Sequence, residues 1–472
     1  MAERLRFTRA LVAAVWRGVF APASILLVAS MVMLVAPTEN ADDAVASTFL
    51  SRTFGNTGTG SAGGTTNNSS GTLGSAPTVS SGYYTWTVPA SGRYQLLVEG
   101  AQGGTKAGAG YTAGAGTSVT TEWNLTAGQS LQIYVGQQGG SSTYAGGGGG
   151  ASGVFATSGS PATILSMAGG GGGAGWNFGG NNAGTSSSGG ASGGRSGGSG
   201  GNGGPAGWYS GDCGIGAGGG GYLTNGSSND GSASSGPVSG NTNGGKSHAN
   251  GGAGGTVAVC GTPGPGGFGA AGGGAGAYGG GGGGGYSGGA GGQYRYLDSR
   301  TGGGGGGSYA AGALSATISG GSRTGHGNVV ITLLAPAPTT FSTQAASPSN
   351  ATSLDYDVVF SESVTGLDVD DFAVSGTSAG WSVSSVAGSG TTYVVTVDSP
   401  SPTTGTVVLT MLQNAVYGTS TQQNGPGGDT AAATMNIDVD PPGASVSSVP
   451  SSPAAAVSLT FGMSFTESVS GI

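Results

Sequence analysis

The chain has 472 residues, of which 109 are glycine, and only 7% of its residues are charged. An average soluble protein has about 7% glycine and about 25% charged residues, so this composition excludes an ordinary enzyme-like domain throughout the chain. The formal net charge is −8. Nucleic acid is therefore disfavoured as a partner, because its binding depends on Lys and Arg that neutralise phosphate.

The N-terminus carries an export pattern. Four arginines within the first 17 residues precede an apolar stretch at 19–36, so residues 1–46 are interpreted as a secretory signal peptide. The nearest small-x-small cleavage pattern, Ala44-Val45-Ala46, lies beyond three acidic residues, which keeps an uncleaved N-terminal anchor open. We expect an extracellular or cell-envelope surface protein that meets the membrane only through this segment, if it is uncleaved.

Alternating apolar residues predict a β-sheet after the signal. The alternation occurs in runs at 84–88, 94–98 and 131–135, as in half-buried strands. Turn residues at 89–92 and 126–129 separate the runs and predict two hairpins. A last strand at 329–333 is expected to pair back to this sheet, with Trp86 and Trp123 in the core.

Uninterrupted glycine runs fill much of the chain between 146 and 307. Such runs are typical of flexible linkers, because glycine loses the most backbone entropy on ordering. Aromatic residues within the tract instead favour packed, extended glycine segments with three residues per turn. Both interpretations stay open here. The rings belong to Tyr144, Phe155, Trp176, Phe178, Trp208, Tyr209, Tyr222, Phe268, Tyr278, Tyr286, Tyr294, Tyr296 and Tyr309.

Several segments together resemble a known domain. They include YYTWTVPASGRYQLLVEGAQGG, TEWNLTAGQSLQIYVGQQGG, ILSMAGGGGGAGW and GHGNVVITLL. In this order the segments resemble the glycine-rich domain of the anaplastic lymphoma kinase and leukocyte tyrosine kinase ectodomains, a domain that is also found in bacterial surface proteins. The resemblance implies an all-β fold over 47–335, a β-sandwich head with inserted polyglycine helices, and a ligand-binding or structural role outside the cell. It does not extend to kinase chemistry, since H-R-D and D-F-G motifs are lacking.

Past Pro336 the composition changes and short alternating strands follow. VVFSESVTGLDVDDFAVSG resembles the immunoglobulin-like β-sandwich repeats of bacterial adhesins and predicts one repeat at 336–440. VVFSESVTGL recurs as MSFTESVSGI 105 residues later, so 441–472 is interpreted as a truncated second repeat. On this basis we expect the chain to be a fragment of a longer adhesin-like protein.

Three sets of residues are candidates for site chemistry. The carboxylates of Asp368, Asp370, Asp371, Asp438 and Asp440 fit either calcium ligands or solubilising turn charges. Cys213 and Cys260 are the only cysteines, and they could form one disulfide after export or be buried as small apolar residues. The stretch 240–247 matches a phosphate-binding loop, but it lacks the strand before and the helix after that such a loop needs.

These observations predict a non-catalytic binding or adhesion protein with no cofactor other than calcium. Its ligand would be an unidentified protein or glycan outside the cell, bound by a glycine-rich head on an acidic immunoglobulin-like stalk. A self-associating structural matrix protein is the alternative, and an enzyme is a remote one.

Overall fold

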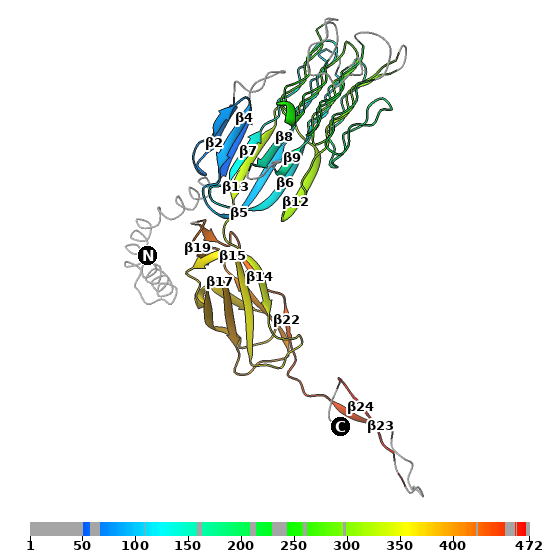
Figure 1. The fold of residues 1–472 in the computed structure, drawn as a ribbon. Coiled ribbons are helices and arrows are strands. Elements are labelled where there is room, and N and C mark those ends of the chain that lie inside the picture. The colour runs from blue at the N-terminus through cyan, green and yellow to red at the C-terminus, as the bar shows by residue number, and fades with distance from the viewer. Residues whose placement is uncertain are drawn as a thin grey trace, which may run out of the picture. The chain divides into compact units, whose positions relative to one another are not determined.

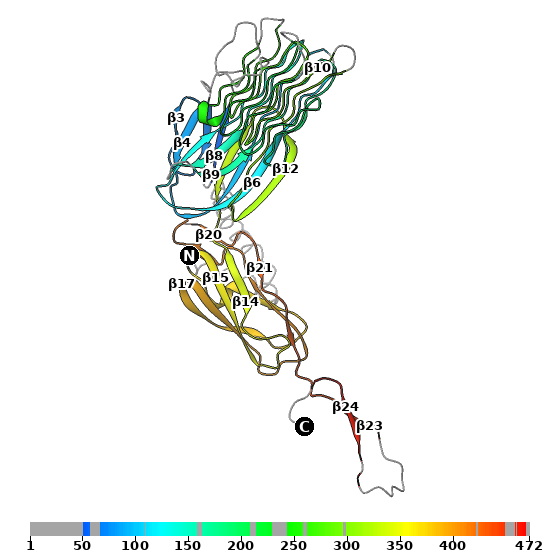
Figure 2. The same ribbon diagram turned by 45° about the vertical axis from the view of Figure 1, so that its right-hand side comes forward.

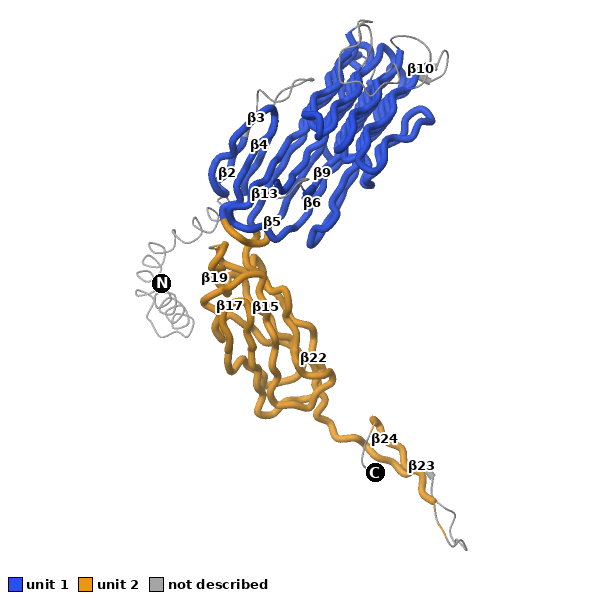
Figure 3. Tube along the Cα trace, viewed as in Figure 1, with its two compact units in different colours: residues 1–89, 94–333 blue, residues 90–93, 334–472 orange. Residues whose placement is uncertain are grey.

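The computed structural model describes residues 51–56, 67–108, 110–157, 163–207, 214–228, 243–257, 262–295, 299–421, 423–448, 458 and 460–468. The predicted signal or anchor at 1–46 lies outside these residues. The described fold is all-β, as predicted, with two short 3-10 helices and no α-helix among these residues. The chain divides into two compact units, residues 1–89 with 94–333 and residues 90–93 with 334–472 (Figure 3).

Two antiparallel sheets form the base of the first unit (Figure 1). A six-stranded sheet has the order β12-β6-β5-β13-β1-β2, and a five-stranded sheet has the order β3-β4-β7-β8-β9. Their strands are β1 (Ser51–Asn56), β2 (Asn67–Gly71), β3 (Thr78–Ser80), β4 (Tyr83–Thr87), β5 (Gly92–Glu99), β6 (Gly116–Leu125), β7 (Ser130–Tyr134), β8 (Ser152–Ala156), β9 (Thr163–Ala168), β12 (Ser315–Arg323) and β13 (Asn328–Leu333).

The two sheets share one apolar core, which makes them a sandwich. Along β1 and β5 buried residues alternate with partly exposed ones, because successive strand residues point to opposite faces. Trp86 is 1% exposed, whereas Trp123 is only partly buried against the core. Both sheets contribute to this core, through Phe54, Trp86, Leu96, Val119, Leu131, Val154 and Ile331.

The two predicted hairpins are wrong. The turn at 89–92 joins β4 to β5, and the turn at 126–129 joins β6 to β7, but in each case the two strands belong to different sheets. Turn residues indicate that the chain reverses, and they do not determine which sheet the next strand joins. The predicted last strand is confirmed, since β13 pairs antiparallel with β5 and β1.

Between β9 and β12 the chain forms a layer of glycine-rich segments that run side by side (Figures 1 and 2). This glycine layer contains few regular elements: β10 (Tyr294–Arg295), β11 (Ser299–Arg300) and the 3-10 helix η1 (His248–Asn250). The runs at 169–173, 281–285 and 302–307 are buried throughout. The described part of the tract is therefore packed.

Hydrogen bonds in the glycine layer repeat every three residues. Each amide of 280–285 donates to another segment, and every third amide returns to the same segment. The pairs, amide first, are Gly280–Thr301, Gly281–Gly146, Gly282–Ala217, Gly283–Gly304, Gly284–Gly149 and Gly285–Gly220. The carbonyls of 280–284 accept, in order, from Gly292, Gly173, Gly273, Gly289 and Gly170. One segment thus exchanges backbone hydrogen bonds with six neighbouring segments.

Close backbone contact explains why these positions are glycine. A Cβ on Gly283 would collide with the carbonyl oxygen of Gly170, and a Cβ on Gly303 with that of Gly281. Because the neighbouring atoms are backbone, they cannot rotate away as a side chain could. The glycines are required by the spacing of the segments.

The second unit is a smaller two-sheet structure. β15 lies between β14 and β19, pairs also with β17, and faces a sheet built around β18. Its elements are β14 (Pro338–Thr343), β15 (Ser353–Thr365), η2 (Val369–Asp371), β16 (Phe372–Ser375), β17 (Ser382–Asp398), β18 (Gly405–Met411), β19 (Val416–Gly418), β20 (Asn424–Gly425), β21 (Thr430–Ala431) and β22 (Met435–Ile437). Tyr356, Val395 and Leu409 lie in its core.

A last hairpin, β23 (Ala444–Ser448) with β24 (Gly462–Phe465), has the same register as the first hairpin of this unit. Phe341 lies opposite Val358 between β14 and β15, and 105 residues later Val446 lies opposite Met463. Val358 is buried, whereas Val446 and Met463 are more than half exposed. The last hairpin therefore repeats the strand pairing of the first, but its apolar side chains are not packed into a core.

We expect Gly283→Ala to destabilise the first unit by about 1–3 kcal/mol, because the added Cβ overpacks a site walled by backbone. Gly184→Ala is the matched control, since its nearest neighbour would be the Ser188 carbonyl oxygen at 3.6 Å. Urea unfolding followed by tryptophan fluorescence measures both. Equal stability of the two variants would contradict the packed glycine layer.

Trp86→Ala is expected to cost about 3–5 kcal/mol, because the ring fills the sandwich core. Trp123→Ala should cost less, because its side chain is only partly buried. The same unfolding measurement compares them, and the reverse order of costs would show that the core is assigned wrongly.

Candidate ligand-binding site

Aromatic residues lie at both ends of the glycine segments. The segment 279–285 lies between Tyr278 and Tyr286, and the run ending at Gly307 is followed by Tyr309. The run at 169–173 leads to Trp176. The rings form two groups with different surroundings, which we call the histidine cluster and the cation–aromatic ladder.

The histidine cluster packs beside the sandwich. Phe155 stacks on His248 at 4.4 Å between ring centroids, and Tyr222 and Tyr134 stack on the same imidazole at 5.3 Å each. η1 positions His248, and the Tyr83 hydroxyl donates to its carbonyl at 3.4 Å. The remaining members of the cluster are Phe268, Tyr286 and Tyr309.

This environment favours a neutral imidazole. Burial lowers the pKa of His248 to about 4, and its Nδ1 is buried without a hydrogen-bond partner. Burial also raises the pKa of Tyr83 to about 12. The histidine cluster is therefore an uncharged anchor for the glycine segments, and in this state it offers no charge to a ligand.

The cation–aromatic ladder consists of Tyr144, Trp176, Tyr278 and Tyr294, together with Lys106 and Arg300. Tyr278 stacks on Tyr294 at 4.7 Å, and Trp176 meets Tyr278 edge-on at 5.5 Å. The Trp176 amide donates to the Tyr278 carbonyl at 2.8 Å, which fixes the two segments together. All six side chains are half-buried, so each keeps part of its surface in contact with solvent.

Two cations lie over these rings. The Lys106 Nζ lies 4.5 Å from the Trp176 ring centroid, and the Arg300 Cζ lies 4.6 Å from that of Tyr278. Cation–π contacts of this kind contribute about 0.5–2 kcal/mol and hold a long side chain in place. Within the described part of the chain, neither cation forms an ion pair or a side-chain hydrogen bond. Among the described residues, no acceptor uses their N–H donors.

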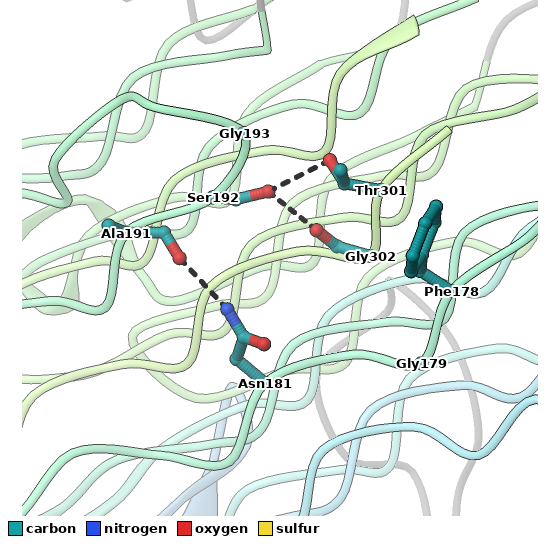
Figure 4. A pocket seen from close by; sticks show the side chains of 8 residues that line it. All are labelled: Phe178, Gly179, Asn181, Ala191, Ser192, Gly193, Thr301 and Gly302. Carbon is teal, nitrogen blue, oxygen red and sulfur yellow. Dashed lines mark hydrogen bonds between the residues drawn. The ribbon is translucent and has the colours of Figure 1, made fainter. Parts of the chain in front are cut away.

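A pocket of about 270 Å³ is lined in part by residues that lie close to Trp176 and Arg300 in the chain (Figure 4). Phe178, which is 48% exposed, forms one wall two residues after Trp176, and Thr301 follows Arg300 directly. Ser192 Oγ donates to the Gly302 carbonyl at 2.6 Å, and Asn181 Nδ2 donates to the Ala191 carbonyl at 2.9 Å. The pocket thus combines one apolar ring with fixed hydroxyl and amide groups.

The predicted aspartates serve local backbone turns. Asp368 Oδ1 accepts from the Asp370 amide at 2.9 Å, and Asp371 Oδ2 accepts from the Asp368 amide at 2.7 Å, which caps η2. Asp438 Oδ1 accepts from the Asp440 amide at 3.2 Å. Burial raises the pKa of Asp371 to about 6, and the charges of Asp368 and Asp370 add to this effect.

No group of three or more His, Cys, Asp and Glu side chains that could hold a metal ion occurs in the described ranges. The calcium site stays a prediction of the sequence. Cys213 and Cys260 lie outside the described residues, as does the first part of the 240–247 motif, so the disulfide also stays a prediction. Ser247 of that motif precedes the 3-residue helix η1.

The sequence reasoning missed Lys106 and Arg300. The only available signal was their rarity, since Lys and Arg together number 12 in the whole chain. No protein-family model and no curated protein matches the sequence. Among the described residues, no helix is both long and apolar enough to cross a membrane.

The first unit should lose stability as the pH falls from about 6.5 to about 4. The folded-state pKa of His248 is below its unfolded value, so the unfolded chain takes up the proton first and gains stability relative to the folded chain. The loss attributable to this residue is about 3 kcal/mol. His326 contributes in the same direction, since burial lowers its pKa and Arg323 adds to the effect.

His248→Phe isolates that contribution, because it keeps a ring in the stack and removes the titration. The difference in unfolding free energy between the wild type and this variant should change between pH 7 and pH 4. Parallel pH profiles would contradict a buried neutral His248.

Proposed function

We propose that this protein is a non-catalytic binding protein at the cell-envelope surface or outside the cell. The glycine layer acts in this proposal as a rigid slab of packed polyglycine helices that displays the ladder and its pocket. The acidic immunoglobulin-like unit serves as a stalk. The observation that carries the proposal is the pair of cations held over the rings without a carboxylate partner among the described residues.

Rigidity supports binding as the role of the ladder. A ligand that meets side chains already held in one arrangement loses less conformational entropy on binding. Backbone hydrogen bonds from several segments fix the positions from which Trp176 and Tyr278 extend. The site is therefore prepared for a partner before the partner arrives.

The polar groups of the pocket favour binding over catalysis. Ser192 and Thr301 contact each other at 3.2 Å, and neither has a histidine or carboxylate beside it within the described residues. A hydroxyl nucleophile needs such a base to be activated. Hydroxyls held in this way are better suited to accept and donate hydrogen bonds.

A self-associating matrix protein is the second candidate, and one observation favours it. β12 is one of the two outer strands of the six-stranded sheet, and Leu314 just before it is 57% exposed. An outer strand presents unpaired backbone groups that can pair with another chain. Its serines and its arginine make it polar, which weakens this alternative.

The purified protein is expected to sediment as a monomer at micromolar concentration, with slow hydrogen exchange at the glycine amides of 280–285. Analytical ultracentrifugation and exchange mass spectrometry measure the two properties. Concentration-dependent assembly that Leu314→Ser abolishes would favour the matrix function, and fast exchange throughout the layer would remove the rigid display.

A further inference from the structure

We infer that the ladder binds a sugar acid, a glycan residue that carries a carboxylate. This inference rests on the proposed binding function and specifies its ligand. Arg300 is half-buried, lies over Tyr278, and makes no side-chain hydrogen bond within the described chain. A guanidinium presents its N–H donors in a planar fork that matches the two oxygens of a carboxylate. Lys106, over the neighbouring indole, adds a second positive charge.

The scarcity of Lys and Arg in the chain points to a ligand with an isolated acid group. The net charge is −8, and Lys and Arg number only 12 in 472 residues. Residues 51–335 hold only eight Lys and Arg, beside five Asp and Glu, and eleven of the other acidic residues lie beyond residue 336. Cations are therefore sparse around the ladder, whereas the binding of a densely charged polyanion needs many phosphate or sulfate contacts. Two cations that both approach Trp176 are enough for one carboxylate. The site therefore fits a glycan with a single acidic group on a sugar residue.

The pocket beside the ladder favours a sugar over a peptide. Its lining offers a hydroxyl and amide set, with Phe178 as the one large apolar side chain. Asn181 uses its Nδ2 on the Ala191 carbonyl, and its Oδ1 makes no hydrogen bond to the described chain. A pyranose presents several hydroxyl groups and one flat C–H face, which suit these groups and the exposed ring. A peptide anchor would instead need a larger apolar pocket.

The test compares each acidic oligosaccharide with its own neutral form. Oligosaccharides of glucuronic, galacturonic and mannuronic acid are titrated calorimetrically into the purified protein, each beside a counterpart whose carboxyl group is reduced to an alcohol. At least one acid should bind, and its reduced form should bind about 10- to 100-fold more weakly, since a hydrogen bond to a charged group is lost. Binding should also weaken between 0.05 and 0.5 M salt.

Three variants connect this binding to the ladder. Arg300→Met should weaken binding of the acid about 10- to 100-fold and leave binding of the reduced sugar unchanged. Arg300→Lys should restore part of the loss, because it keeps the charge without the planar fork. Lys246→Met is the matched control, since it removes the same charge from a residue outside the ladder. Circular dichroism checks that each variant is folded.

The outcomes separate this inference from the proposed function. Equal binding of acidic and reduced sugars, abolished by Phe178→Ala, would overturn the acid specificity and leave a binding protein. Binding of a carboxylate-bearing peptide but of none of the sugars would overturn the glycan and keep the ligand site. Failure of every probe in a protein that assembles with concentration would overturn both proposals.

Discussion

Backbone contact between glycine segments is the constraint on which the first unit depends. Each amide of 280–285 donates to a carbonyl of another segment. A single segment therefore depends on its neighbours for these backbone hydrogen bonds. Ordering glycine costs more conformational entropy than ordering any other residue, and each hydrogen bond contributes only about 1 kcal/mol to the stability of the fold. The layer can therefore be stable only as a whole, with its segments anchored at both ends. The sandwich supplies one anchor through β9 and β12, and the rings supply others.

The sequence could predict the features whose signals lie in neighbouring residues, and it could not predict contacts between distant segments. Alternation around Trp86 and Leu96 predicted strands and their buried faces, because a strand's period is carried by neighbouring residues. The rings favoured a packed tract but left a flexible linker open. The partner of each glycine run could not be predicted, since segments without side chains carry no information about register. The contact between Arg300 and Tyr278 depends on that register, so the ladder could not be found from the sequence.

The two related hairpins of the second unit show that the same strand pairing can form with or without burial of its apolar side chains. Phe341 with Val358 and Val446 with Met463 have the same register, so similar sequences specify the same pairing. Only the first pair is packed against a second sheet, in which Leu409 and Met411 are buried. The register is thus a property of the hairpin sequence, whereas the core requires strands that are distant in the chain.

The two ends of the glycine segments differ in what they can do chemically. At the sandwich end the rings enclose His248, and burial there lowers the pKa of the imidazole to about 4, which shows how strongly this environment disfavours a positive charge. At the other end none of the four rings is fully buried, whereas Tyr134 and Phe155 of the histidine cluster are. Lys106 and Arg300 therefore keep solvent beside them while the rings hold their positions. A charged ligand could be recognised only where charge is tolerated. In the binding function proposed above, one end of the layer therefore anchors the segments and the other end is left for recognition.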